Sequence, residues 1–151
     1  MLDKNLIKLS LASAADFFAI KHFFKQHKQS SASRNDLIYT VHYQTKLIGL
    51  ARLIPIEDSV KPSYWLRGLF IETDFRQQRL ASHLLNFITS DLNVRHDTFE
   101  ILAFPHAHLN ALYKRCDFQT IDINHLPISL QLTYQNALNQ GKHWLCMAFI
   151  E

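Results

Sequence analysis

The segment of residues 66–85, "LRGLFIETDFRQQRLASHLL", restricts the possible folds more than any other part of the sequence. Its first residues are mostly apolar, as in a buried strand, whereas its last residues place apolar side chains at helical spacing. The turn between the two parts is rich in Arg and Gln. A strand that leads directly into an amphipathic helix predicts a fold in which helices cover a sheet.

The rest of the sequence also alternates between strand-like and helix-like segments. We expect strands at 5–11, 64–71, 98–104, 117–123 and 143–150, and helices at 12–27, 76–92, 106–115 and 129–140. Two further apolar runs, 36–43 and 46–55, are joined by "QT" and predict a hairpin. Ser13 and Asp16 are a candidate cap for the first helix, and Gly141 would end the last one. This order predicts an α/β (α+β) fold with a mixed sheet and flanking helices.

The composition is that of a globular protein. The chain has 151 residues, of which 48% are hydrophobic and 19% charged, so we expect a single domain over residues 1–151. The net charge of +3 favours an anionic ligand, but the basic residues are dispersed, which argues against a nucleic-acid partner. No apolar run spans a membrane and the N-terminus has no secretory signal, so we expect a cytoplasmic protein without a membrane partner. Cys116 and Cys146, the two cysteines, are expected to be buried thiols.

The basic turn has two interpretations. A helix N-terminus attracts phosphate because its N–H groups are free and its partial charge is positive. Arg76 and Arg79 would add full charges there, and Ser82 a hydroxyl donor. Alternatively, Asp74 and Gln77 form an ordinary capping box that needs no ligand. The common glycine-rich nucleotide motifs are absent from the sequence, so spacing alone favours the cap.

Three segments in the same order resemble the GNAT superfamily of acetyl-CoA-dependent N-acetyltransferases. The turn resembles the family's R/Q-x-x-G-x-G/A motif, with Arg76, Arg79 and Ala81 at the first, middle and last positions. Downstream, "NALYKRCDF" resembles the family's helix-to-strand element. Upstream, "YTVHYQTKLIGLARL" resembles the hairpin formed by the family's second and third strands, with Gly49 at the usual place. The resemblance implies a mixed, mostly antiparallel sheet with one splayed parallel strand pair.

The resemblance also implies a role for each matching residue. Acetyl-CoA, with no metal, would lie where strands 64–71 and 98–104 splay apart. The residues implied in cofactor binding are Leu69, Phe70 and Ile71, whose backbone would pair with the pantetheine arm, then Arg76, Gln77, Gln78, Arg79, Leu80, Ala81 and Ser82 at the phosphates, and His106 at the pantetheine. Tyr113 matches the family's frequent general acid; the alternative is a buried aromatic on the core face of its helix. His106 has an alternative role as the start of that helix.

Two positions depart from the family pattern. Arg79 replaces a glycine, which costs on the order of 1–2 kcal/mol if that position needs a positive φ. The residues around it are good helix formers, so we expect Arg79 to be helical instead and to supply a cation. Asp117 replaces the glycine before Phe118, a mild change because Asp tolerates left-handed geometry.

The general base is not identified by the sequence. A lysine-like amine needs roughly 4–5 kcal/mol to become neutral at pH 7, so a base or a water chain must take its proton. The family often uses a glutamate on the first cleft strand, but the only charged residue in strand 64–71 is Arg67. The candidates are Glu72, Glu57, Asp58, His42 and Glu100, and water-mediated deprotonation is also open.

The resemblance implies an N-acetyltransferase. The acetyl group would pass by direct attack from acetyl-CoA to a primary amine of an unidentified small molecule or protein. The alternative is a degenerate acyl-CoA-binding domain that acts as a sensor or scaffold, and we expect a monomer or a homodimer. "HAH" at 106–108 does not predict a metal site, because two His at this spacing point to different faces of a helix. Acceptor specificity would depend on the loops 28–36, 55–63 and 124–142.

Overall fold

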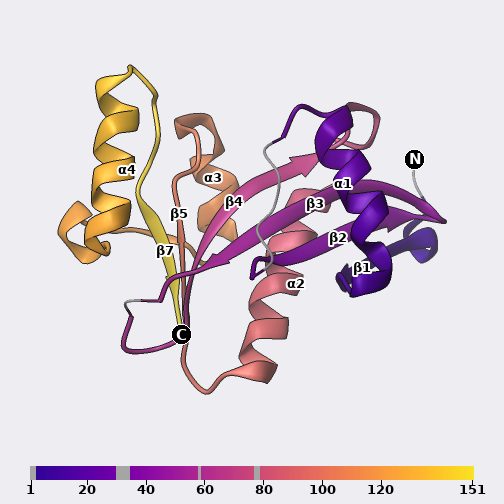
Figure 1. Cartoon of the computed structure of the whole chain (residues 1–151), viewed down its shortest axis with the longest axis horizontal. Helices are drawn as coiled ribbons and strands as arrows, with labels where there is room; N and C mark the ends of the chain where they lie inside the picture. Colours follow the sequence, from indigo (N-terminus) through magenta and orange to yellow (C-terminus); the bar gives the residue numbers. More distant parts are fainter. Residues whose placement is uncertain (1–2, 30–34, 58, 77–78) are drawn as a thin grey trace. The chain divides into compact units, whose positions relative to one another are not determined.

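The computed structural model describes residues 3–29, 35–57, 59–76 and 79–151. The strands are β1 (Ile7–Leu11), β2 (Leu37–Tyr43), β3 (Lys46–Pro55), β4 (Ser63–Ile71), β5 (Glu100–Ala103), β6 (Gln119–Thr120) and β7 (Met147–Ile150), and the α-helices are α1 (Phe17–Gln26), α2 (Leu80–Arg95), α3 (Asn110–Arg115) and α4 (Ile128–Asn139) (Figure 1). Within these residues the strands form one seven-stranded sheet in the order β1-β2-β3-β4-β5-β7-β6. β4 and β5 are parallel, whereas β1/β2, β2/β3, β5/β7 and β6/β7 are antiparallel. The predicted mixed, mostly antiparallel sheet with one parallel pair is confirmed.

The chain divides into two compact units. The first comprises Met1–Ile54 and Arg67–Ile88, and the second Pro55–Leu66 and Thr89–Glu151. Strand β4 and helix α2 therefore each contribute residues to both units. That the chain is a single domain over residues 1–151 stays a prediction. Among the described helices, none combines the length and the apolar character that crossing a membrane requires.

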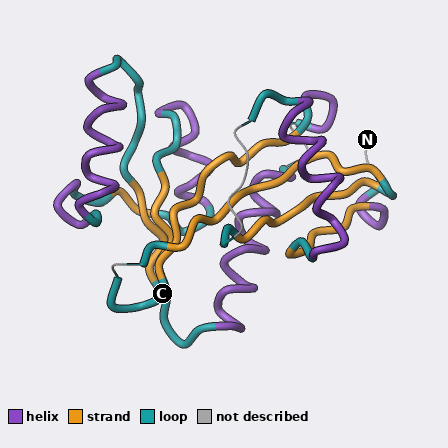
Figure 2. Tube along the Cα trace, in the orientation of Figure 1, coloured by secondary structure: helices purple, strands orange, loops and turns teal. Residues whose placement is uncertain are grey.

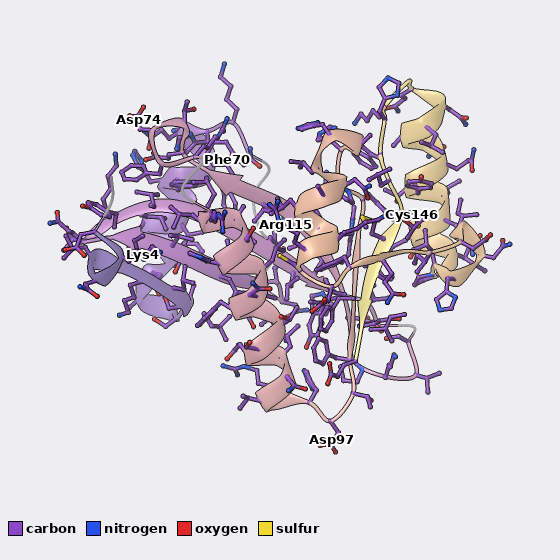
Figure 3. The ribbon with its side chains drawn as sticks, turned by 180° about the vertical axis from the view of Figure 1, so that it is seen from behind. Lys4, Phe70, Asp74, Asp97, Arg115 and Cys146 are labelled. Carbon is purple, nitrogen blue, oxygen red and sulfur yellow. The ribbon has the colours of Figure 1, made fainter. Side chains whose placement is uncertain are left out.

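In the first unit, helices cover both faces of the hairpin strands. Ile20, Phe23 and Phe24 of α1 pack against Ile38 of β2 and Leu50 of β3, and Figure 1 shows α1 lying across these strands. Tyr39, the neighbour of Ile38 on β2, points to the opposite face, where its ring contacts Phe87 of α2 at 6.0 Å between centroids. The view from behind in Figure 3 shows α2 on that side. Alternation along β2 thus assigns one helix to each face.

Close packing between β3 and β4 depends on a glycine. A Cβ atom at Gly49 would lie 2.8 Å from the carbonyl oxygen of Phe70 and 2.5 Å from Cδ1 of Ile71. Just beyond, the N–H of Glu72 donates to the carbonyl of Ile48 at 2.8 Å. The absence of a side chain at this position therefore lets the last residues of β4 lie against β3.

In the second unit, the two faces of β5 and β7 contact different helices. Leu102 and Ala148 are register partners and belong to a core cluster with Leu130 of α4. Phe149 points the other way, where its ring lies 5.9 Å from that of Phe118, which in turn contacts Tyr113 of α3. Figure 2 shows α4 and the long loop that leads from it to β7. The second unit therefore also has a helix on each face of its strands.

The local signals at three helix or hairpin boundaries are confirmed. The carboxylate of Asp16 accepts the N–H of Ser13 at 2.8 Å, which caps the 3₁₀ turn that leads into α1 at Phe17. Gly141 follows α4 with a φ of +83°, a conformation that ends helices and favours glycine. The β2–β3 hairpin turns at Gln44, whose φ is +55°.

Several predicted segments are shorter than expected, and three of them show the reasons. The strand predicted over 117–123 pairs only at Gln119 and Thr120, because Asp117 is left-handed and a 3₁₀ turn begins at Ile123. The helix predicted over 106–115 becomes α-helical only at Asn110, after a 3₁₀ turn. The strand predicted over 143–150 joins the sheet at Met147, and the residues before it bond instead to the loop after β5.

Candidate active site

Strand β4 continues past its last partner in β5. The parallel register ends at Leu66 and Ala103, whereas β4 runs on to Ile71. Gly68 has a φ of +71°, a conformation that bends a strand and favours glycine. The nearest atom to a Cβ built there is the side-chain oxygen of Gln29, at 3.8 Å, so the backbone conformation and not crowding requires the glycine. Sequence reasoning missed Gly68, although a glycine inside a strand-like segment is a known signal of a bend.

The turn after β4 is fixed by Arg76. Its Nε donates to the carbonyl of Ile71 at 2.7 Å, and its guanidinium lies 5.2 Å from the centre of the Phe70 ring. Asp74 belongs to a 3₁₀ turn at Thr73–Phe75, and Figure 3 labels Phe70 on β4 and Asp74 in the turn beyond it. Asp74 is thus separated from the start of α2. Gln77, its expected partner in a capping box, lies with Gln78 outside the described residues.

The conformation of Arg79 differs from the prediction. Its φ is +59°, so the expectation that Arg79 is helical is wrong, and α2 begins one residue later, at Leu80. The Arg79 carbonyl accepts the N–H of His83 at 3.0 Å, which makes Arg79 the residue that precedes the first helical turn. The turn imposes the left-handed conformation that a glycine would adopt freely, and this requirement outweighs the helix propensity of the neighbours. The backbone strain costs on the order of 1–2 kcal/mol.

The other predicted cofactor residues of the first unit lie along one continuous segment. Leu69, Phe70 and Ile71 end β4, and Leu80, Ala81 and Ser82 form the first turn of α2. Arg76 and Arg79 are exposed, whereas Leu80 is buried in the core. The structure thus brings two solvent-accessible guanidinium groups and the start of a 16-residue helix together. Such a set of donors fits a phosphate-bearing ligand.

A network at the end of β4 includes a histidine that the sequence did not single out. Nε2 of His27 lies 3.1 Å from Oε2 of Glu72, and Nζ of Lys46 lies 3.3 Å from Oε1 of the same carboxylate. The His27 ring contacts the rings of Phe23 and Phe70 at 4.4 and 4.7 Å. Because 45 residues separate His27 from Glu72, no local spacing could have indicated the pair.

The remaining base candidates have separate surroundings. Glu100 begins β5 and accepts the Ser63 hydroxyl at 3.1 Å, at the amino end of the parallel pair. His42 lies within β2, opposite Leu47 of β3. Glu57 is exposed in the loop after β3, and Asp58 lies outside the described residues. Of these candidates, Glu72 follows directly on β4 at the carboxyl end of that strand.

Tyr113 lies on α3 in the second unit and is 4% exposed. Its ring meets Phe118 edge to face at 5.3 Å, and the Tyr113 carbonyl accepts the N–H of Phe118 at 3.1 Å. Burial, and to a lesser degree Cys116, raises the pKa of Tyr113 well above its usual value. Asp117 has a φ of +68°, so the expected left-handed geometry at this glycine position is confirmed. The phenol is therefore held in its protonated form.

His106 directly precedes the 3₁₀ turn that leads to α3. This position agrees with the interpretation of His106 as the start of that helical segment. Its backbone forms an isolated antiparallel bridge with Trp144. The rings of His106 and His108 lie nearly parallel, 5.8 Å apart, so the expectation that they point to different faces is wrong. The reason is that His106 is extended and not helical. In the described part of the chain, no three His, Cys, Asp or Glu residues group as metal ligands.

Comparisons with known proteins match these features to one family. The family model for an acetyltransferase (GNAT) domain matches residues 34–120, more than half of the chain. No curated protein sequence matches the chain significantly.

Solved structures share the fold at low sequence identity. The chain is similar to N-acetylglutamate synthase from Neisseria gonorrhoeae, with a TM-score of 0.69, 13% identity, and coverage of 98% of this chain but only 36% of that protein. It is also similar to the ribosomal-protein-S18-alanine N-acetyltransferase from Escherichia coli (TM-score 0.65, 16% identity, 95% and 93% covered). Naa50 from Arabidopsis thaliana gives a TM-score of 0.62 at 13% identity, with 95% and 97% covered. These TM-scores establish similarity of fold, and at such low identities they establish the fold alone.

Proposed function

Because the chain belongs to the GNAT acetyltransferase family, we propose that it transfers the acetyl group of acetyl-CoA to a primary amine. One observation supports the proposal most directly: β4 runs on past its pairing with β5, and Arg76 and the left-handed Arg79 lie between its end and the start of α2. Two structurally similar proteins have been solved with coenzyme A or a CoA-containing bisubstrate analogue. The acceptor is an unidentified small molecule or protein.

The first unit offers the groups that binding acetyl-CoA requires. We infer that the backbone of Leu69–Ile71 pairs with the amides of the pantetheine arm as an added strand. The N–H groups at the start of α2, with Arg76, Arg79 and Ser82, bind the phosphates, because a helix N-terminus and guanidinium groups both favour anions. Since Nε of Arg76 is engaged by the Ile71 carbonyl, the two terminal nitrogens of Arg76 would serve the phosphates. His106, in the second unit, is proposed to bond to the pantetheine.

The proposed chemistry is a direct transfer. The neutral acceptor amine attacks the thioester carbonyl, the carbon–sulfur bond breaks, and the amine nitrogen gives up one proton to solvent water as the amide forms. Tyr113 donates a proton to the departing thiolate, and the resulting phenolate takes a proton back from solvent. A donor must be protonated when the reaction begins, and Tyr113 meets this requirement because burial raises its pKa, although the same shift makes the phenol a weaker acid.

The proton of the acceptor ammonium needs a separate base. Glu72 is the candidate that the surroundings favour, because it follows β4 directly and its carboxylate is 13% exposed and bonded to His27. Glu100 is less suited, since it lies at the amino end of β5, whereas Glu72 lies at the carboxyl end of β4. A water chain that leads to Glu72 would serve the same purpose.

A thiol-release assay with acetyl-CoA and a panel of primary amines tests the proposal, with direct titration of acetyl-CoA as a parallel measurement. We expect heat on titration, a raised melting temperature and turnover with at least one amine. Binding without turnover across the panel would favour the sensor or scaffold alternative. Millimolar acetyl-CoA that gives neither heat nor a thermal shift would exclude both functions.

A further inference from the structure

A hollow in the second unit is lined by basic and aromatic side chains that the proposed transfer does not use as a group. It has a volume of about 570 Å³ and is bordered by two short segments, His106–His108 and Gly141–Trp144. Three imidazoles and one ammonium group line it, and its lining includes no Asp or Glu. We propose that this hollow binds the carboxylate or phosphate group of an anionic amine acceptor, an inference that rests on the proposed function.

The backbone around the hollow is fixed by hydrogen bonds between the two segments. The N–H of Ala107 donates to the His143 carbonyl, and the N–H of Leu145 donates to the Pro105 carbonyl, each at 2.8 Å. His106 and Trp144 form the bridge between these bonds. The N–H of Lys142 bonds back to the Ala137 carbonyl of α4 at 3.0 Å. The side chains therefore project from a frame that is already ordered, which reduces the entropy cost of binding.

One lining residue of the hollow, Trp144, is held from two sides. Its indole ring stacks on Phe104 at 5.9 Å, and its carbonyl accepts the Tyr134 hydroxyl at 2.9 Å. The ammonium of Lys142 lies 5.0 Å from the centre of the Trp144 ring. An aromatic side chain beside cationic donors suits a small ligand with an apolar body and an anionic group.

The chemistry of the lining favours an anion over a metal ion. The described part of the chain contains no group of three or more His, Cys, Asp or Glu residues that could hold a metal ion, so the three histidines of the hollow do not form one. An ammonium group and neutral or protonated imidazoles all offer N–H donors, which pair with carboxylate or phosphate oxygens. With no carboxylate in the lining, an anion meets attraction and no opposing charge.

Position links the hollow to the acceptor. It begins three residues after Ala103, the last residue of β5, and ligands of sheets with parallel strands bind beyond the carboxyl ends of those strands. The segment that contains His106 and His108 continues directly into α3, which holds Tyr113. Lys142 lies in the connection between α4 and β7 and is the last residue of segment 124–142, which was expected to determine acceptor specificity.

The first arm of the test measures binding alone. Backbone amide shifts are followed by NMR during titration with inorganic phosphate or β-alanine at constant ionic strength, with ethanolamine as the ligand that lacks an anionic group. We expect saturable shifts at 106–108 and 141–144 with at least one of the two anions. The Lys142→Met/His143→Gln double variant should lose them, whereas Lys142→Arg and the charge-matched Lys114→Met/His125→Gln control, outside the hollow, should keep them. No saturable shift at these amides, or the same shift with ethanolamine, would overturn the proposal.

The second arm measures transfer with matched amines: phosphoethanolamine against ethanolamine, and β-alanine against β-alaninamide. We expect kcat/KM to favour the anionic member of one pair about tenfold, and the pair concerned identifies phosphate or carboxylate. The Lys142→Met/His143→Gln variant should lose that preference while acetyl-CoA affinity is unchanged. A preference that survives in this variant would contradict the assignment. Saturable shifts without any turnover would support the anion site but refute acetyl transfer, and with it the identity of the ligand as an acceptor.

Discussion

The two units hold their site residues in opposite ways. In the first, Arg76 and Arg79 are exposed on a turn, and one of them has a strained, left-handed backbone. In the second, Tyr113 is buried among apolar groups, and burial raises its pKa. Charges that capture an anionic ligand must be accessible to that ligand, whereas burial disfavours the charged form of a phenol and so keeps it protonated. Substitutions in the first unit should therefore change cofactor affinity, and substitution of Tyr113 should change the rate.

The largest expected effect comes from Tyr113→Phe. Loss of a positioned acid lowers kcat about 10²–10⁴-fold, while the retained ring preserves the packing on Phe118. Acetyl-CoA affinity by titration and the melting temperature should stay near those of the wild type. Because the pKa of Tyr113 is raised, ionisation of the phenol should not lower the rate of the wild type until the pH exceeds the usual tyrosine range.

Tyr64→Phe is the matched control for this variant. The Tyr64 hydroxyl of the wild type lies 3.0 Å from Nε2 of His96 and has no proposed part in the transfer. Tyr64 belongs to the same unit as Tyr113. The Tyr64→Phe variant should leave kcat unchanged and lower the free energy of unfolding by about 1 kcal/mol. If Tyr113→Phe instead lost stability at unchanged kcat, Tyr113 would be a core aromatic, and the contrast between the units would disappear.

The next effect concerns the shape of β4, which two glycines determine for different reasons. Gly49→Ala forces a Cβ against the Phe70 carbonyl and should destabilise by about 1–3 kcal/mol. Gly68→Ala has room for its Cβ but keeps a φ of +71°, which costs about 1–2 kcal/mol. Denaturant unfolding measures both, and both should weaken acetyl-CoA binding because the end of β4 moves. Unchanged affinity in two destabilised variants would show that the pantetheine arm does not pair there.

Local sequence patterns predicted most of the helices and strands, but they could not predict contacts between residues far apart in the chain. Helix α2 follows from apolar periodicity and the β2–β3 hairpin from two apolar runs joined by a short turn, whereas Tyr113 was singled out by the family resemblance. The conformation of Arg79 was mispredicted because its neighbours favour helix, whereas the turn between strand and helix demands a left-handed residue. The contact between His27 and Glu72 joins α1 to the end of β4, and no local pattern encodes such a distance.

A smaller effect is expected from the exposed charges of the first unit. Arg79→Ala should raise the Kd for acetyl-CoA about tenfold at low salt and less at high salt, because exposed charges are screened. Isothermal titration at two salt concentrations measures both values. Lys21→Ala, which removes an exposed cation from α1 in the same unit, is the control and should leave the Kd unchanged. Equal affinities for Arg79→Ala and the wild type would show that the Arg79 side chain does not bind the phosphates. Arg76 and the backbone of the turn would then have to bind them.

The smallest effect separates the charge of Arg79 from its backbone. Arg79→Gly removes the guanidinium but permits the left-handed φ of +59° without strain. Relief of the strain should raise the free energy of unfolding relative to Arg79→Ala by about 1 kcal/mol, after part of the gain is offset by the flexibility of glycine in the unfolded chain. Acetyl-CoA affinity should fall as it does in Arg79→Ala, because both variants lack the cation. If Arg79→Gly instead bound acetyl-CoA more tightly than the wild type, close approach of the backbone to the phosphates would matter more than the charge, and Arg79 would be an obstacle that this chain tolerates.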